Sequence, residues 1–262
     1  MKYIKNTGIK FKKLIKKIFN KLGFNITKIN NEICSINFDD LLKEKIISNP
    51  IIFDVGGNRG QSIERFKKIF KNPIIHSFEP IKSEYDFMNK KFLGDKNVFL
   101  NNFALGDKIE EKEFNITAKT ANSSFNQINP DGEWIKVRSN QYKTTIEGYV
   151  TSRQKVKIYT LDQYCLDKKI TGIDLLKIDT QGYEDKVLQG STYELKKNIK
   201  VIKTEIMFDN VYSKYFSFSD IEKYVLPNDF RMIGIDLANN NLFSGLAFSA
   251  DVYYFNKKYF NL

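Results

Sequence analysis

The chain has 262 residues, of which 42% are hydrophobic and 14% aromatic, which suits one globular α/β domain with an extension and excludes an intrinsically disordered protein. The formal net charge is +11, but residues 1–28 contain nine lysines and no acid, so they carry +9 and leave only +2 for all other residues. The body of the chain is therefore not expected to bind nucleic acid.

The counts of histidine and cysteine limit the kinds of metal site and disulfide that the chain could form. A single histidine excludes a multi-histidine metal site. The two cysteines lie far apart without CxxC spacing, as is typical of free thiols in a reducing compartment.

Residues 1–30 are predicted to contain a basic amphipathic helix, at about residues 8–23. Six apolar residues recur there at helical spacing between lysines: Phe11, Leu14, Ile15, Ile18, Phe19 and Leu22. No apolar run is long enough for a signal peptide or a membrane span, so we expect a cytoplasmic protein. The helix could bind an anionic lipid surface, which would make the protein peripheral at the inner face of the membrane. Its apolar stripe could equally pack on the domain or on a second copy of the chain, in a homodimer.

Residues 31–262 are predicted to form one α/β domain in which strands and helices alternate. The first half is expected to contain a helix at 38–47, strand 50–55, helix 62–70, strand 73–80, helix 83–93 and strands 97–105 and 112–118. After a long irregular insertion at 119–155 come strand 155–160, helix 161–167, strand 173–179, helix 183–190, strand 200–207, helix 218–226 and strands 230–237 and 246–256. This order predicts a mostly parallel sheet with helices on both faces and a ligand at the carboxyl ends of the strands.

A glycine-rich turn follows the first of these parallel strands, which ends at Asp54. The sequence D-V-G-G-N-R-G places three glycines before the next helix: Gly56, Gly57 and Gly60. Such glycines allow a tight turn and close approach of the backbone to a ligand. The dinucleotide fingerprint G-x-G-x-x-G fails in both registers, at Asn58 and at Val55, and no Walker Gly-Lys-Ser/Thr is present. The turn therefore predicts a nucleotide-like ligand but speaks against an NAD-dependent oxidoreductase.

The next two strands end in residues that suit a nucleoside. Glu79 ends the second strand, where a carboxylate can accept hydrogen bonds from both ribose hydroxyls. Asn102 and Phe103 end the third, where an amide suits the edge of adenine and an aromatic ring its face. Asparagine at a strand end is also an ordinary turn residue.

Three carboxylates are the candidates for a general base. Asp179 ends the fourth parallel strand in L-K-I-D-T-Q-G-Y-E, Glu184 opens the following helix, and Glu205 ends the fifth strand. Asp179 and Glu205 could instead hold a divalent metal, but two carboxylates are too few to predict one. His76 lies inside a strand and is expected to be structural.

The 119–155 insertion is expected to cover the acceptor substrate. It offers hydroxyl groups and aromatic faces, which are means of binding a sugar. The candidate acceptor-binding residues are Ser123, Ser124 and Trp134, together with Tyr183 on the helix after Asp179.

Taken together, these motifs resemble those of the FkbM family of S-adenosylmethionine-dependent methyltransferases, over roughly residues 49–210. The matching segments are D-V-G-G-N-R-G, F-E-P, N-F-A-L-G, S-S, L-K-I-D-T-Q-G-Y-E and T-E-I. Gly57 stands where the family usually has alanine. Gln181 replaces the glutamate of the family's D-x-E-G, so position 181 offers no carboxylate as base or metal ligand.

The resemblance implies a class I methyltransferase (Rossmann-like) fold, with a seven-stranded, mostly parallel sheet whose last strand is antiparallel. It implies S-adenosylmethionine as cofactor, with Asp54, Gly56, Asn58 and Gly60 around its methionine part. Glu79 would bind the ribose, and Asn102 and Phe103 would border the adenine.

The activity that the resemblance implies is O-methyl transfer, to a hydroxyl of a sugar, nucleotide sugar or surface glycan in polysaccharide biosynthesis. Two alternatives stay open: an NAD-dependent oxidoreductase, and a non-catalytic, membrane-associated nucleotide-binding subunit. The joint presence of Asp54, Glu79 and Asp179 speaks against the second.

Overall fold

A computed structural model of the chain describes Phe19 and residues 37–46, 48–208, 210–214, 217–237 and 248–260. The chain divides into two compact units, residues 1–37 and 38–262. Apart from Phe19, the amphipathic helix predicted in residues 1–30 lies outside the described residues, so its membrane or dimer contacts stay predictions. Within the described ranges, no helix combines the length and hydrophobicity that crossing a membrane would require.

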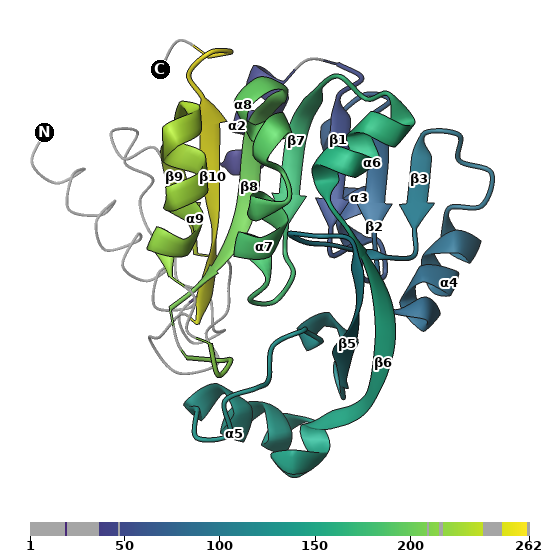
Figure 1. Ribbon diagram of the computed structural model, residues 1–262, viewed down its shortest axis with the longest axis vertical. Helices are drawn as coiled ribbons and strands as arrows, with labels where there is room; N and C mark the ends of the chain where they lie inside the picture. Colours follow the sequence, from purple (N-terminus) through teal and green to yellow (C-terminus); the bar gives the residue numbers. More distant parts are fainter. Residues whose placement is uncertain are drawn as a thin grey trace, which may run out of the picture. The chain divides into compact units, whose positions relative to one another are not determined.

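A seven-stranded sheet is the centre of the second unit, with strand order β3-β2-β1-β7-β8-β10-β9 (Figure 1). The strands are β1 (Ile51–Val55), β2 (Ile74–Phe78), β3 (Val98–Asn101), β7 (Ile173–Ile178), β8 (Ile199–Met207), β9 (Phe230–Asp236) and β10 (Ser249–Asn256). The pairings from β3 to β8 are parallel, and β10 is antiparallel to both of its neighbours. The predicted mostly parallel seven-stranded sheet with an antiparallel last strand is confirmed.

Helices cover both faces of this sheet, because its central strands are apolar on both sides. Neighbouring residues of β1 enter different clusters: Ile52 belongs to one and Phe53 to the other. The Ile52 cluster includes residues from α2 (Phe38–Lys45), α3 (Gln61–Ile69) and α4 (Lys82–Lys91). The Phe53 cluster includes residues from α6 (Leu161–Lys168), α7 (Glu184–Gln189), α8 (Thr192–Lys197) and α9 (Phe218–Val225).

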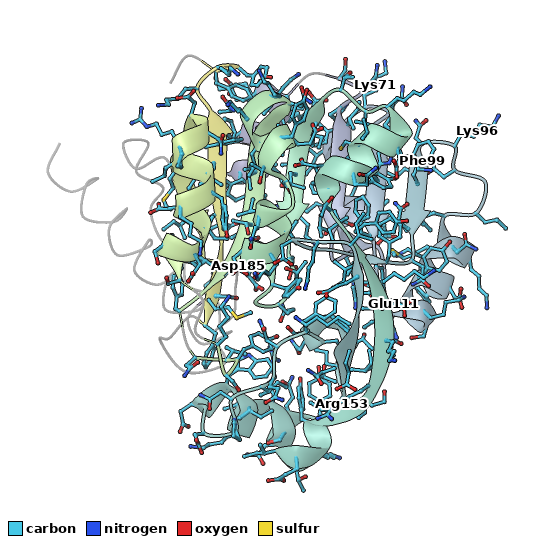
Figure 2. All side chains as sticks on the ribbon, viewed as in Figure 1. Lys71, Lys96, Phe99, Glu111, Arg153 and Asp185 are labelled. Carbon is cyan, nitrogen blue, oxygen red and sulfur yellow. The ribbon has the colours of Figure 1, made fainter. Side chains whose placement is uncertain are left out.

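A smaller three-stranded sheet lies beyond the carboxyl ends of the parallel strands (Figure 1). It is built from β4 (Ala104–Leu105), β5 (Glu110–Thr117) and β6 (Val150–Tyr159), in the order β4-β6-β5. Figure 2 shows Glu111 of β5 and Arg153 of β6 on this sheet. The sheet holds the ends of the 119–155 insertion beside the main sheet.

The insertion itself is more regular than predicted. It contains two short 3-10 turns, η1 (Thr120–Asn122) and η2 (Glu147–Tyr149), with α5 (Glu133–Gln141) between them. The sequence did not reveal α5 because its buried residues Trp134 and Ile135 are adjacent rather than spaced along one helical face. They pack with Tyr149 and with residues after β8 in a separate cluster.

Candidate functional site

The glycine turn after β1 lies directly against the end of β7. Gly56 has φ +83°, and a methyl group on its Cα would lie 1.9 Å from the carbonyl oxygen of Asp179. A methyl group on Gly57 would lie 2.2 Å from the Ser77 hydroxyl oxygen, and one on Gly60 would lie 2.4 Å from the Phe92 ring. The turn therefore needs glycine at position 56 both for its backbone conformation and for the contact between the two strand ends.

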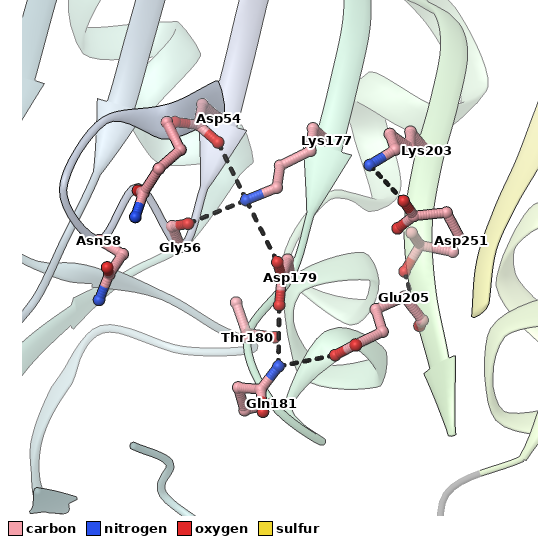
Figure 3. A network of polar contacts seen from close by, with 12 residues as sticks. Asp54, Gly56, Asn58, Lys177, Asp179, Thr180, Gln181, Lys203, Glu205 and Asp251 are labelled. Atoms are coloured by element: carbon pink, nitrogen blue, oxygen red, sulfur yellow. Dashed lines mark hydrogen bonds and ion pairs between the residues drawn. The ribbon is translucent and has the colours of Figure 1, made fainter. Parts of the chain in front are cut away.

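A buried ion pair lies beneath this turn. Asp54 and Lys177 are opposite each other in the β1–β7 pairing, with side chains 0% and 4% exposed and 3.1 Å between Nζ and Oδ1. The Lys177 ammonium also donates to the Gly56 carbonyl oxygen at 2.9 Å, as Figure 3 shows. Burial alone would lower the pKa of Lys177, but the carboxylates of Asp54 and Asp179 raise it above its ordinary value. Lys177 is thus a charged ammonium that ties the turn to β7.

Glu79, at the end of β2, holds the other side of the turn. Its carboxylate accepts the backbone N–H groups of Asn58 and Ile81, each at 2.7 Å. Burial raises its pKa to about 7, although these two hydrogen bonds act in the opposite direction. Glu79 is therefore both a structural acceptor and a group that titrates near neutral pH.

A cavity, here called the turn cavity, opens between the glycine turn, the end of β2 and the insertion. Its polar walls include Asn58, Glu79, Thr120, Ser123, Asp179 and Gln181. Its apolar walls include Phe78, Ile81, Ala104, Leu105, Phe125 and Tyr183. One wall thus offers apolar surface and another a carboxylate beside backbone amides.

Several predicted cofactor residues lie just outside the turn cavity. Asp54 is buried beneath the turn with Lys177. Asn102 is exposed and donates to the carbonyl oxygens of Glu79 and Pro80, while Phe103 packs on Phe78 and on core tyrosines. The next two residues along the chain, Ala104 and Leu105, reach the cavity instead.

A second, more polar cleft adjoins the turn cavity and is called here the polar cleft. It is lined by Lys119, Asn122, Trp134 and Arg138 from the insertion, and by Glu205, Met207, Val211, Phe248 and Ser249 from β8, the segment after it and the start of β10. Ala121, Asp179 and Gln181 line both spaces. The two spaces therefore meet at Asp179 and Gln181.

The side chain of Gln181 links two carboxylates at this meeting point (Figure 3). Its Nε2 donates to Asp179 Oδ1 at 3.0 Å and to Glu205 Oε2 at 2.7 Å. Its Oε1 accepts from the Tyr212 hydroxyl at 3.2 Å and from Asn122 at 3.4 Å. A glutamate here would present a third acidic group to Asp179 and Glu205, whereas the amide supplies the donors that they need.

The three predicted base candidates have different surroundings. The side chain of Asp179 is 41% exposed and lines both spaces. Glu205 lines only the polar cleft, and burial, then the charges of Asp179 and Glu184, raise its pKa well above its usual range. Glu184 lines neither space; it accepts the Thr180 N–H at 2.7 Å, and burial raises its pKa to about 7. Only Asp179 and Glu205 can therefore reach a molecule in the polar cleft.

The four predicted acceptor residues fall into different places. Ser123 and Tyr183 line the turn cavity, and Trp134 lines the polar cleft. Ser124 is buried, and its hydroxyl donates to the Gln181 carbonyl oxygen at 2.7 Å. Ser124 thus holds the loop that carries Gln181.

His76 lines neither the turn cavity nor the polar cleft. His76 Nδ1 lies 2.8 Å from the Tyr164 hydroxyl oxygen, and burial lowers the pKa of the imidazole to about 4. In the part of the chain that the structure describes, no three histidine, cysteine, aspartate or glutamate side chains form a metal-binding group.

Three charged residues of the site were missed from sequence. Lys177 could have been found, because a single lysine in the apolar strand I-D-L-L-K-I needs a buried partner. Lys119 and Arg138 carried no such signal, since basic residues are frequent throughout the chain.

The chain is similar to a known protein family and, over part of its length, to a curated protein. Residues 54–232 match the family model of the methyltransferase FkbM domain. An uncharacterized protein of Methanocaldococcus jannaschii is 32% identical over 126 residues, which cover 47% of this chain and 46% of that protein, so the chain spans about half the length of this curated relative.

Two solved structures illustrate the more distant similarities. A putative rRNA-methylase from Clostridium thermocellum is 12% identical, with 87% of this chain and 97% of that chain covered and a TM-score of 0.44. Fibrillarin from Aeropyrum pernix with bound S-adenosyl-L-methionine is 11% identical, with 83% and 73% covered and a TM-score of 0.44. The family match spans more than half of the chain, and on that ground the chain belongs to the FkbM methyltransferase family, with S-adenosylmethionine as its cofactor.

Proposed function

We propose that this methyltransferase methylates a hydroxyl group of a sugar, nucleotide sugar or surface glycan in polysaccharide biosynthesis. The observation that carries the proposal is that Asp179 and Gln181 line both the turn cavity and the polar cleft. A cofactor in the first space and an acceptor in the second would meet at a carboxylate that can take the hydroxyl proton.

The turn cavity suits S-adenosylmethionine. Gly56 keeps the backbone free of a side chain where the turn meets β7. The oxygens of Glu79 each hold one backbone amide and have a further lone pair for the ribose hydroxyls. Leu105 and Phe78 offer an apolar surface to adenine, in the place predicted for Phe103. Asp54 would act through Lys177 and the turn rather than by touching the cofactor.

Proton removal is assigned to Asp179. The methyl group of the bound cofactor is already activated by the sulfonium, so the protein mainly aligns an in-line transfer. Asp179 alone among the three carboxylates lines both spaces. Glu205, held by the same Gln181 amide, would orient the acceptor hydroxyl from the other side.

The polar cleft suits an acceptor with many hydroxyl groups. Asn122, Gln181 and Glu205 supply amide and carboxylate partners, and Trp134 supplies an aromatic ring. Such a mixture of polar groups around an aromatic ring is suited to a carbohydrate better than to an apolar acceptor.

Radiolabelled S-adenosylmethionine and a panel of monosaccharides, nucleotide sugars and glycan fragments test the proposal. We expect label on a sugar hydroxyl, with kcat reduced about 100-fold or more in Asp179→Asn while the Kd for S-adenosylhomocysteine stays within a few-fold. Asp86→Asn is the matched control and should be as active as wild type, because Asp86 lies on α4 outside both spaces and, among the residues that the structure describes, pairs only with Lys82. Label on nitrogen, or full activity in Asp179→Asn, would contradict the assignment.

A further inference from the structure

Two basic side chains of the insertion line the polar cleft without an acidic partner. These are Lys119, just before η1, and Arg138 on α5. Neither forms an ion pair with any residue that the structure describes. Lys177, in contrast, is buried in an ion pair with Asp54.

The positive charge of Arg138 acts on Lys119 across the cleft. Burial, and next the charge of Arg138, lower the pKa of Lys119. Asp179 and Glu205 line the same cleft from the strand ends, where Gln181 joins them to each other rather than to either cation. The cleft therefore concentrates positive charge at the end formed by the insertion.

The guanidinium group of Arg138 is held in place while its buried Nε donor is unused. It lies over the Trp134 ring, 5.5 Å from the centroid, and Nη1 donates to Gln141 Oε1 at 2.9 Å. Its Nε is buried and has no hydrogen-bond acceptor. A buried donor without an acceptor is unfavourable, and guanidinium groups bind carboxylate or phosphate oxygens through their N–H edges.

We infer that the acceptor carries an anionic group, which Lys119 and Arg138 bind while the hydroxyl to be methylated lies at Asp179. The group is a carboxylate, as in a uronic acid, or a phosphate, as in a sugar phosphate or nucleotide sugar. This inference rests on the proposed function and adds the charge of the substrate to it. It also gives the insertion a role in acceptor selection rather than in cofactor binding.

Calorimetric titration of the protein saturated with S-adenosylhomocysteine tests the inference, with glucose, glucuronate and glucose 1-phosphate as probes. We expect at least one anionic probe to bind about tenfold or more tightly than glucose. Lys119→Gln and Arg138→Gln should each remove most of this preference, and Arg138→Lys should keep part of it. Whether glucuronate or glucose 1-phosphate binds more tightly shows whether the anionic group is a carboxylate or a phosphate.

The control variant is Lys136→Gln, an exposed position on the same helix that changes the net charge by the same amount. It should bind all probes like wild type, and thermal unfolding should show that every variant is folded. Equal binding of glucose and both anions, or an anion preference that survives in both Gln variants, would overturn the inference.

These outcomes are separable from failure of the proposed function. Anion binding that depends on Lys119 and Arg138, without methyl transfer to any sugar, would leave the inference standing and remove the sugar O-methyltransferase. Methyl transfer to neutral sugars without any preference for anionic probes would leave the proposed function standing and overturn the inference.

Discussion

Replacing Lys177 by methionine tests whether a buried ion pair holds the cofactor turn. The change keeps most of the side-chain volume but leaves Asp54 as an unpaired carboxylate that is 0% exposed. It also removes the donor to the Gly56 carbonyl oxygen. Breaking a buried ion pair by removing one partner typically costs about 3–5 kcal/mol. We therefore expect the free energy of unfolding to fall by that amount.

Urea unfolding followed by circular dichroism measures this loss, and titration with S-adenosylhomocysteine should show about tenfold weaker binding in the folded variant. Lys168→Met, on the exposed surface of α6, is the matched control and should change stability by less than about 0.5 kcal/mol.

A second variant distinguishes the cost of the unpaired Asp54 charge from the cost of losing the lysine side chain itself. Asp54→Asn/Lys177→Met removes both charges and keeps an acceptor for the Ser77 hydroxyl, which donates to Asp54 at 3.0 Å. The double variant should be more stable than Lys177→Met by about 2 kcal/mol or more, because no unpaired charge is buried. A cost below about 1 kcal/mol for Lys177→Met, or a double variant no more stable than Lys177→Met, would refute this explanation.

Three further predictions concern single residues of the site. The pKa of Glu79 is raised to about 7, so affinity for S-adenosylhomocysteine should increase from about pH 6 to 8 as the carboxylate forms, and Glu79→Gln should abolish this dependence in calorimetric titrations. Glu184 has a folded-state pKa of about 7 against 4.5, so the proton it keeps stabilises the fold below about pH 4.5 and this contribution is lost as the pH rises through 7. Glu184→Gln should therefore gain on the order of 2–3 kcal/mol relative to wild type between pH 4.5 and 8 in urea unfolding, and an unchanged difference would contradict the prediction. Gly56→Ala should lose measurable binding of S-adenosylhomocysteine because its methyl group meets the Asp179 carbonyl oxygen, whereas Gly94→Ala, which has the same φ of +83° but open space around it, should bind normally.

The sheet and the turn were predictable from sequence because their signals are local. The apolar strand, the glycines and the helical spacing after them all lie between residues 49 and 70. The order of carboxylates at strand ends also follows from the alternation of strands and helices. Those signals were enough to predict that Glu79, Asp179 and Gln181 lie at one edge of the sheet.

The site contacts that were not predicted depend on strand register and on packing between segments that are distant in the sequence. Lys177 meets Asp54 because β1 and β7 pair in one particular register, which the two strand sequences do not specify. The turn between β3 and β4 directs Phe103 into the aromatic core and Leu105 to the turn cavity, a shift of two residues that the motif does not reveal. The cleft residue Arg138 lies on a helix that hydrophobic spacing did not predict.

The most direct test of the account is calorimetric titration of wild type and Glu79→Ala with S-adenosylhomocysteine, and of wild type with NAD. We expect wild type to bind S-adenosylhomocysteine, Glu79→Ala to bind it at least about tenfold more weakly, and NAD not to bind. Equal affinity of wild type and Glu79→Ala for S-adenosylhomocysteine, or tight binding of NAD, would contradict the assignment of the turn cavity as the cofactor site.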